Sequence, residues 1–342
     1  MAKRMPQRTG MAGMTLIELM IAMTIGLALT IAVSAVYVNT SRARNDLERV
    51  SQATDNARFA VDLLTEDLRH AGFFGPFIPA NDAVYVPSDP CNTAWNAQGW
   101  DLTASPQQMP VAVEGLDDPV ALPAGWACLP DVLPGSDVVT LRRVVETPVM
   151  PASITTTDVP YVQASQCTTD ADPVRYSNDS AVFTLRNLAC DDPALSPVPA
   201  RQYITRTYYV ASCNVCAPSD GVPTLKRVEM RDGALTVQAL AEGVVDMQLQ
   251  YGFDADGDGD VDAYQVGLNG VGGDPGNDWS NVMAVRTHML MQSTGRISGA
   301  ADTRTYNLGP GHTAETCPDG RRCILTNNTV RLINVAGRRE TP

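Results

Sequence analysis

Several features that enzymes and nucleic-acid-binding proteins depend on are scarce or missing in this 342-residue chain. Histidine occurs only three times, as His70, His288 and His312, and no Gly-x-Ser-x-Gly motif marks a hydrolase nucleophile. No glycine-rich phosphate loop followed by Lys and Ser or Thr is present. The net charge is −13, whereas general nucleic-acid binding needs Lys and Arg against phosphate. We therefore expect neither an enzyme nor a nucleic-acid-binding protein, and we interpret the histidines as structural or exposed.

Charge and proline are both absent from long stretches near the amino terminus. No charged side chain occurs between residues 19 and 38, and no proline occurs between Met14 and Gly75. At about 1.5 Å per residue, an uncharged helix of this length crosses the roughly 30 Å core of a bilayer. The residues before Met14 carry Lys3, Arg4 and Arg8 but no acid, which leaves a net charge of −16 on the rest. This basic flank predicts a cytoplasmic amino terminus and a carboxyl-terminal bulk outside.

Beyond residue 38 the pattern becomes amphipathic. Apolar residues recur every three or four positions on one face, at Leu47, Val50, Ala57, Ala60, Leu64, Leu68 and Ala71. The sequence predicts one helix of roughly 58 residues, about 85–90 Å long, that ends at Gly72 and Gly75-Pro76. The apolar stripe lasts only about 25 residues past the membrane segment, so it favours packing on a following domain over a coiled-coil stalk.

Cysteine is absent from this helix, and all eight cysteines follow it. An even number of cysteines in an exported domain predicts disulfides. We expect pairs of sequence neighbours, namely Cys91–Cys128, Cys167–Cys190, Cys213–Cys216 and Cys317–Cys323, the last across a Pro-Asp-Gly turn. A redox or zinc role for Cys213-Asn-Val-Cys216 is the alternative. It lacks the two further ligands that zinc needs and a thioredoxin-like βαβ context, so we favour a structural disulfide.

The part of the chain after residue 72 shows strand patterns rather than helical ones. Residues 73–135 are rich in Pro, Gly, Asn and Asp and predict a long loop region held by disulfides. Strands are predicted at 137–145, 181–185, 203–210, 224–230, 234–239, 244–251, 282–292 and 329–334. Asp232-Gly233 predicts a hairpin turn between two of them. The expected fold class is α+β, with the long helix packed on an antiparallel sheet head that carries disulfide-rich loop insertions.

One motif points to a metal ion. Aspartates alternate along the chain as Asp254, Asp256, Asp258, Asp260 and Asp262. They match positions 1, 3, 5, 7 and 9 of an EF-hand calcium loop, with Gly259 at position 6. Gln265 stands at position 12 instead of Glu, and no flanking helices are evident, so a full EF-hand is not expected. Because five like charges repel in a compact loop and oxygen ligands favour a hard cation, we expect structural Ca²⁺ rather than a solvated acidic turn.

The start of the helix carries an acid where membrane segments rarely hold one, since Glu18 lies at the mouth of the apolar run. An ordinary signal peptide would place its small residue after a shorter apolar run, and a plain anchor would hold this Glu by accident. The segment Gly13-Met14-Thr15-Leu16-Ile17-Glu18 resembles the class III signal of type IV pilins and pseudopilins, although Met14 replaces the usual Phe. The resemblance implies cleavage after Gly13 by a prepilin peptidase and N-methylation of Met14. It also implies that Glu18 pairs with a neighbouring subunit's terminal amine, because paired charges are less costly in lipid.

Three more segments narrow the resemblance. Residues 59–72, 242–252 and 279–286 are similar to PilW-type minor pilins. The resemblance implies a minor pilin that takes part in type IV pilus assembly, in a priming or tip complex. Its partners would be other major and minor pilins, the inner-membrane assembly platform and the prepilin peptidase.

The resemblance also sets the expected organisation. It comprises a leader at 1–13, a transmembrane half-helix at 14–38, an amphipathic half-helix at 39–72 and a head at 73–342. The head would lie in the periplasm before assembly and on the cell-surface pilus afterwards.

Other functions fit parts of the pattern. A type II secretion pseudopilin has the same leader, so Glu18 does not discriminate it from a pilin. A tip adhesin or DNA-binding pilin would use the Cys-rich middle for recognition, although the acidic charge disfavours DNA. A membrane-anchored enzyme would need a polar pocket with converging histidines or acids.

Overall fold

A computed structural model describes residues 13–339, except 78, 80–82, 156–158, 195, 232, 268–278, 299–301 and 319. Of the expected leader it describes Gly13 alone, since residues 1–12 lie outside the described residues. Asp232 of the expected hairpin turn and Asp319 of the Pro-Asp-Gly turn lie outside them too. The chain divides into two compact units, Met1–Arg49 and Val50–Pro342.

Helix α1 (Leu16–His70) contributes to both units, and it confirms the long helix that the sequence predicts. Its 55 residues correspond to about 80 Å of helix. In the first unit the side chains from Leu16 to Val38 are exposed, and the segment is long and apolar enough to cross a membrane. An apolar surface of this extent is stable in lipid or against other apolar helices, and not in water.

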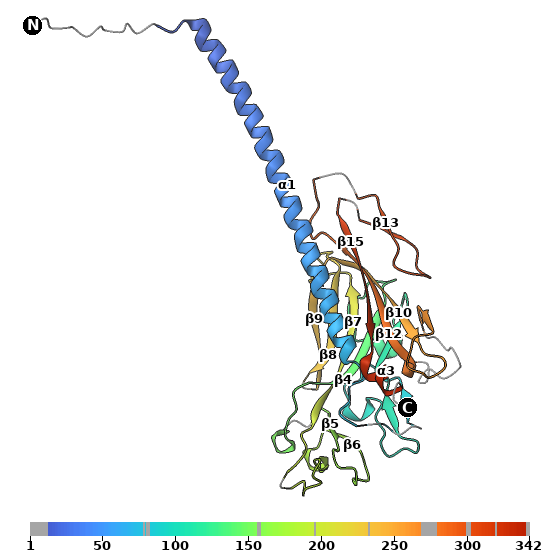
Figure 1. Ribbon diagram of the computed structural model, residues 1–342. Helices are drawn as coiled ribbons and strands as arrows, with labels where there is room; N and C mark the ends of the chain where they lie inside the picture. The colour runs from blue at the N-terminus through green and yellow to red at the C-terminus, as the bar shows by residue number, and fades with distance from the viewer. Residues whose placement is uncertain are drawn as a thin grey trace, which may run out of the picture. The chain divides into compact units, whose positions relative to one another are not determined.

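The second unit is built on two sheets (Figure 1). The first is antiparallel and has the order β11 (Ala263–Gln265), β10 (Val244–Phe253), β12 (Val282–Gln292) and β15 (Cys323–Arg331). The second has the order β3 (Val113–Leu116), β4 (Val138–Val144), β7 (Arg201–Ala211), β5 (Tyr161–Ala164) and β6 (Val174–Ser177), with β8 (Thr224–Arg231) on β7 and β9 (Ala234–Glu242) on β8. All its pairings are antiparallel as well, so the predicted α+β fold class is confirmed.

The core of the head forms where the last part of α1 meets both sheets. Ala57, Ala60, Leu64 and Leu68 of the helix share one cluster with residues of β4 and β7 and of β10 and β12. The two alanines keep the helix surface narrow, and the two leucines fill the space between the sheets. Burying a leucine stabilises the fold by about 1.5–3 kcal/mol, so this face of α1 is part of the head rather than an attachment to it.

One strand prediction is wrong, and another is confirmed only in its first three residues. Residues 181–185 do not form a strand; a 3-10 turn (Ser180–Val182) stands there, because the Asp179 carboxylate accepts a hydrogen bond from the Ala181 N–H at 2.9 Å. The strand expected at 329–334 is β15, which ends at Arg331, and helix α3 (Ile333–Arg339) follows. Asn334 therefore lies in a helix.

The loop region at 73–135 contains more regular structure than its composition predicts. It holds β3, the parallel pair β1 (Val84–Val86) and β2 (Gln108–Pro110), and 3-10 turns at Trp95–Ala97 and Ala124–Trp126. Strands β5 and β6, a 3-10 turn (Pro151–Ser153) and the short antiparallel pair β13 (Thr305–Tyr306) and β14 (Glu315–Thr316) also lacked a clear alternating pattern. Such short strands depend on long-range pairing, which local sequence does not encode.

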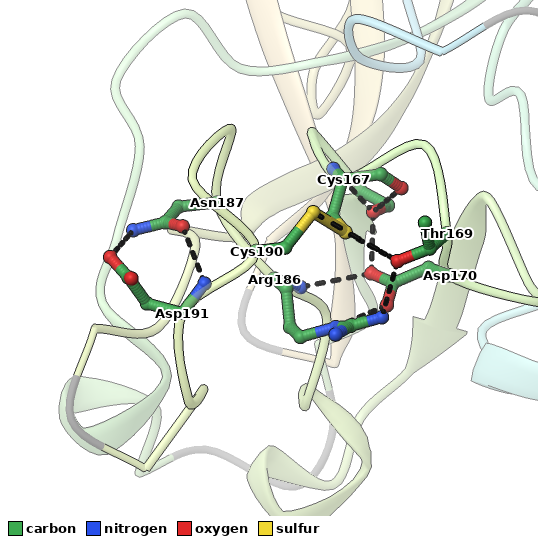
Figure 2. Close-up of a disulfide and its surroundings, with 8 residues drawn as sticks. Cys167, Thr169, Asp170, Arg186, Asn187, Cys190 and Asp191 are labelled. Atoms are coloured by element: carbon green, nitrogen blue, oxygen red, sulfur yellow. Dashed lines mark hydrogen bonds and ion pairs between the residues drawn. A yellow bond between two sulfur atoms is a disulfide. The ribbon is translucent and has the colours of Figure 1, made fainter.

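All four expected disulfides are present, and each pairs sequence neighbours: Cys91–Cys128, Cys167–Cys190, Cys213–Cys216 and Cys317–Cys323. Figure 2 shows the second of them in its polar surroundings. Beside it, Arg186 donates from Nε to Asp170 Oδ1 at 2.6 Å, and the Ser165 hydroxyl donates to Asp170 Oδ2 at 2.6 Å. The bridge and the ion pair together hold loops that have little core of their own.

Candidate functional site

The amino-terminal end of α1 is closed by reciprocal hydrogen bonds between Thr15 and Glu18, which were not among the predicted features. The Thr15 N–H and hydroxyl donate to Glu18 Oε2 at 2.9 and 3.0 Å, and the Glu18 N–H donates to Thr15 Oγ1 at 3.3 Å. This is a capping box, whose signal is a Ser or Thr followed three residues later by Glu or Gln. Met14, the expected new terminus, is 68% exposed beside it. Glu18 thus has a local structural role, independent of any neighbouring subunit.

At the other end of α1, the buried Asp67 joins the helix to the second sheet. Its carboxylate accepts hydrogen bonds from Arg143 on β4 at 2.9 Å, from Arg206 on β7 at 2.7 Å and from the Tyr208 hydroxyl. Burial alone would raise the pKa of Asp67, but the charges of Arg206 and Arg143 and the Tyr208 hydroxyl outweigh it and lower the pKa. Asp67 therefore remains a carboxylate in the core and fixes the helix to two strands.

Helix α3 closes the carboxyl end of α1. The last carbonyls of a helix lack partners within it, and side chains commonly satisfy them. Here the Asn334 amide donates to the carbonyls of Arg69 and Ala71 at 3.1 and 3.3 Å. Arg338 donates to the Gly72 carbonyl at 2.6 Å. The part of α1 in the second unit, residues 50–70, is its inner segment. Residues of the head hold this segment along its buried face and at its last turn.

The acidic loop brings together three of the six predicted ligands. Oxygens of Asp254, Asp256 and Asp262 lie within 4.8 Å of one another. Asp258, Asp260 and Gln265 are not part of that group; Asp260 faces Arg331 at 3.3 Å, and Gln265 lies in β11 opposite Tyr251. The three aspartates that converge are therefore those at positions 1, 3 and 9 of the EF-hand spacing.

Asp254 is the buried member of the acidic loop. Its carboxylate accepts hydrogen bonds from the N–H groups of Gly257 and Gly259 at 2.6 and 3.0 Å and from Arg339 at 2.9 Å. Burial acts to raise the pKa of Asp254, but these donors outweigh it and lower the pKa. Three oxygen donors suit a hard cation such as Ca²⁺, although Arg339 already neutralises part of the charge.

The three histidines have different surroundings. His70 Nδ1 lies 2.8 Å from the Glu66 carbonyl at the end of α1, and His288 Nδ1 lies 2.9 Å from Asn327 Oδ1 between β12 and β15. Both placements are structural. His312, in the loop between β13 and β14, lies instead against the carboxylates of Asp246 and Glu315. The members of this group come from distant segments, so no local sequence pattern predicts it.

The Cys213-Asn-Val-Cys216 motif forms a closed disulfide, as expected. The Lys226 ammonium lies 3.4 Å from Cys216 Sγ, and the Asp131 carboxylate is close to both sulfurs. Zinc would require both cysteines as thiolates, and the disulfide removes them as ligands. The motif here links the end of β7 to the loop before β8.

The match to a protein-family model agrees with the predicted family resemblance. Residues 207–334 match the family model described as Type IV Pilus-assembly protein W. A type IV-like pilin from Thermus thermophilus is similar in structure at 11% identity and a TM-score of 0.36, covering 82% of this chain and 96% of that chain. No curated protein sequence matches this chain. The predicted PilW resemblance is confirmed over the matched residues, which include two of the three segments that carried it.

Proposed function

We propose that this PilW-like, type IV pilus-related chain is a minor pilin that enters pilus assembly through α1, in a priming or tip complex. The observation that carries the proposal is the continuity of α1. One helix contains both an exposed, membrane-length apolar segment and the helical face at the centre of the head's core. A subunit built this way can leave the bilayer for a bundle of like helices without rearranging its head. Its partners would be other pilins and the inner-membrane assembly platform.

The proposal includes processing and docking at the amino terminus. Cleavage after Gly13 would make Met14 the first residue, directly before the capping threonine. Glu18 would then have two tasks: capping its own helix and attracting the terminal amine of a neighbour. A carboxylate with one oxygen engaged by Thr15 has further lone pairs for that amine.

The two tasks of Glu18 can be separated by comparing two substitutions. Glu18→Gln keeps a side chain that serves a capping box but removes the charge, whereas Glu18→Ala removes both. If charge pairing drives incorporation, both variants lose it by about tenfold or more, equivalent to about 1.4 kcal/mol, while cleavage after Gly13 continues. The measurement is the protein in sheared pili relative to whole cells, with mass spectrometry of the amino terminus. Wild-type incorporation of Glu18→Gln would refute the pairing role and leave only the cap.

We also propose that the acidic loop holds a structural Ca²⁺ through Asp254, Asp256 and Asp262. The proposal rests on the convergence of these carboxylates, which occupy positions 1, 3 and 9 of the EF-hand spacing. A cation there would connect the ends of β10 and β11.

Calcium binding to the acidic loop predicts a thermal shift. Millimolar Ca²⁺ should raise the melting temperature of the full chain by about 2–4 °C, because it binds only the folded state. Asp256→Ala should abolish the shift. Asp258→Ala is the matched control, since it removes an equal charge from the same loop outside the converging group, and it should keep the shift. Equal shifts in the two variants would contradict the proposed ligand set.

A further inference from the structure

The loop between β13 and β14 places His312 among carboxylates from three parts of the chain. Its Nε2 lies 3.1 Å from Asp246 Oδ2 on β10 and 3.8 Å from Glu315 Oε1 at the start of β14. One ligand atom from each of these three residues lies within 4.8 Å of the other two. Nitrogen and oxygen donors at such separations can surround a single ion.

The two ring nitrogens of His312 have different roles. Nδ1 faces Asp118 Oδ1 at 3.4 Å, so the tautomer with a proton on Nδ1 directs that proton toward a carboxylate. Nε2 is buried and forms no hydrogen bond of good geometry with the residues that the structure describes. In that tautomer, its lone pair faces two carboxylates, and a cation between them would relieve the repulsion.

A second layer of contacts fixes these groups. The Gln248 amide nitrogen lies 3.0 Å from Asp246 Oδ1, 3.1 Å from Asp118 Oδ1 and 2.8 Å from the Gly135 carbonyl, so its two N–H groups are shared among these acceptors and connect both carboxylates. Asp246 then presents its other oxygen to His312. Histidines that bind metals commonly direct their second ring nitrogen to a carboxylate, as His312 does to Asp118.

We propose that Asp246, His312 and Glu315 form a binding site for a divalent transition-metal ion, and for Zn²⁺ in particular. The imidazole nitrogen favours Zn²⁺ over the hard cations that all-oxygen sites bind. Asp246 is 6% exposed, whereas the Glu315 side chain is 42% exposed, so the site opens to solvent on the Glu315 side. Three protein ligands leave a fourth tetrahedral position on that open side for water or a group from another molecule. The ion would clip the β13–β14 loop onto β10.

The test is zinc binding by the full-length chain, purified in detergent and stripped with a chelator. Equilibrium dialysis against ZnCl₂ with metal analysis should give one Zn²⁺ per wild-type chain. His312→Gln should remove this binding, and His70→Gln, which deletes a histidine outside the group, should bind as the wild type does. Asp118→Asn should retain the stoichiometry but bind about ten times more weakly, as expected for a positioning residue. Co²⁺ in place of Zn²⁺ should give visible absorption that His312→Gln abolishes.

Further variants keep the result decisive. Glu315→Gln changes a partly exposed residue that the core does not need, so it tests the site even if His312→Gln fails to fold by circular dichroism; it should weaken Zn²⁺ binding about tenfold or more. Asp256→Ala, in the acidic loop, should leave Zn²⁺ binding unchanged. The proposal is overturned if the wild type binds no Zn²⁺ at micromolar concentration, if neither His312→Gln nor Glu315→Gln weakens binding, or if Asp256→Ala abolishes it. A wild type without Zn²⁺ would identify the group as a histidine–carboxylate ion-pair cluster instead.

Discussion

Asp67 illustrates how one residue can connect a helix to a sheet through charge. It is 3% exposed and contacts arginines from three strands, β4, β7 and β8. A buried pair of this kind contributes little compared with an apolar pair, but removal of Asp67 leaves the arginines with Glu146 and Glu229 alone as counter-charges among the described residues. The arrangement therefore favours one orientation of the helix face over others rather than simply adding stability.

Replacing Asp67 by Asn should destabilise the full chain by about 3 kcal/mol, because its arginine partners lose their buried counter-charge and retain Glu146 and Glu229. Asp62→Asn, an exposed change on the same helix, should stay within about 0.5 kcal/mol of the wild type. Chemical denaturation with a tryptophan fluorescence readout measures both. An equal effect of the two substitutions would show that the Asp67 charge is not part of the anchor.

The same residue predicts an acid dependence. The pKa of Asp67 is lower in the folded than in the unfolded chain. Its carboxylate therefore contributes fully to the free energy of unfolding above the unfolded pKa near 3.9. This contribution declines as the pH falls through the folded pKa. The stability difference between the wild type and Asp67→Asn should thus shrink below about pH 4. A difference that grows on acidification would contradict the lowered pKa.

At the scale of elements, the inner segment of α1 is the central element of the core. Leu64→Ala should cost about 2–5 kcal/mol, since Leu64 is 1% exposed between the two sheets and its loss leaves a cavity. Phe59→Ala is the control on the same helix; Phe59 is 51% exposed, and its replacement should cost under about 1 kcal/mol. Denaturant unfolding of both variants gives the comparison. A small cost for Leu64→Ala would mean that the sheets close without the helix.

The elements that the sequence predicted well are those with a long local pattern. Helix α1 and the strands β4, β7, β8, β9, β10 and β12 each repeat one period over many residues, and the structure reproduces them. At residues 181–185 the apolar residues predicted a strand. The hydrogen bond from the Ala181 N–H to the Asp179 carboxylate stabilises a 3-10 turn there instead. Short strands such as β3 and β5 form only by pairing with distant partners.

The site residues also divide into those that a local pattern reveals and those that only the tertiary structure brings together. The capping box, the disulfide pairs and the aspartate spacing are local patterns, readable within a few residues or from neighbouring cysteines. The group around His312 combines β10 with a loop much later in the chain, and only tertiary structure brings them together. From sequence alone His312 was interpreted as structural or exposed, because most of its acidic neighbours lie elsewhere in the sequence.

At the scale of the whole molecule, deletion of the gene separates the candidate functions. A priming role predicts loss of surface pili while the major pilin is still made. Normal pili without attachment would indicate an adhesin, and loss of protein secretion would indicate a pseudopilin. Electron microscopy of pili and immunoblots of the major pilin measure the first outcome, and a complementing wild-type copy is the control.

The contacts between α3 and the end of α1 impose an order on how the protein can mature. Asn334 and Arg338 satisfy carbonyls of Arg69, Ala71 and Gly72, although more than 260 residues separate the partners along the chain. Synthesis runs from the amino terminus, so the first helix emerges long before the residues that complete it. The last turn of α1 therefore stays without these partners until nearly the whole chain has been synthesised. The carboxyl end of α1 can thus be completed only after the rest of the head has been made.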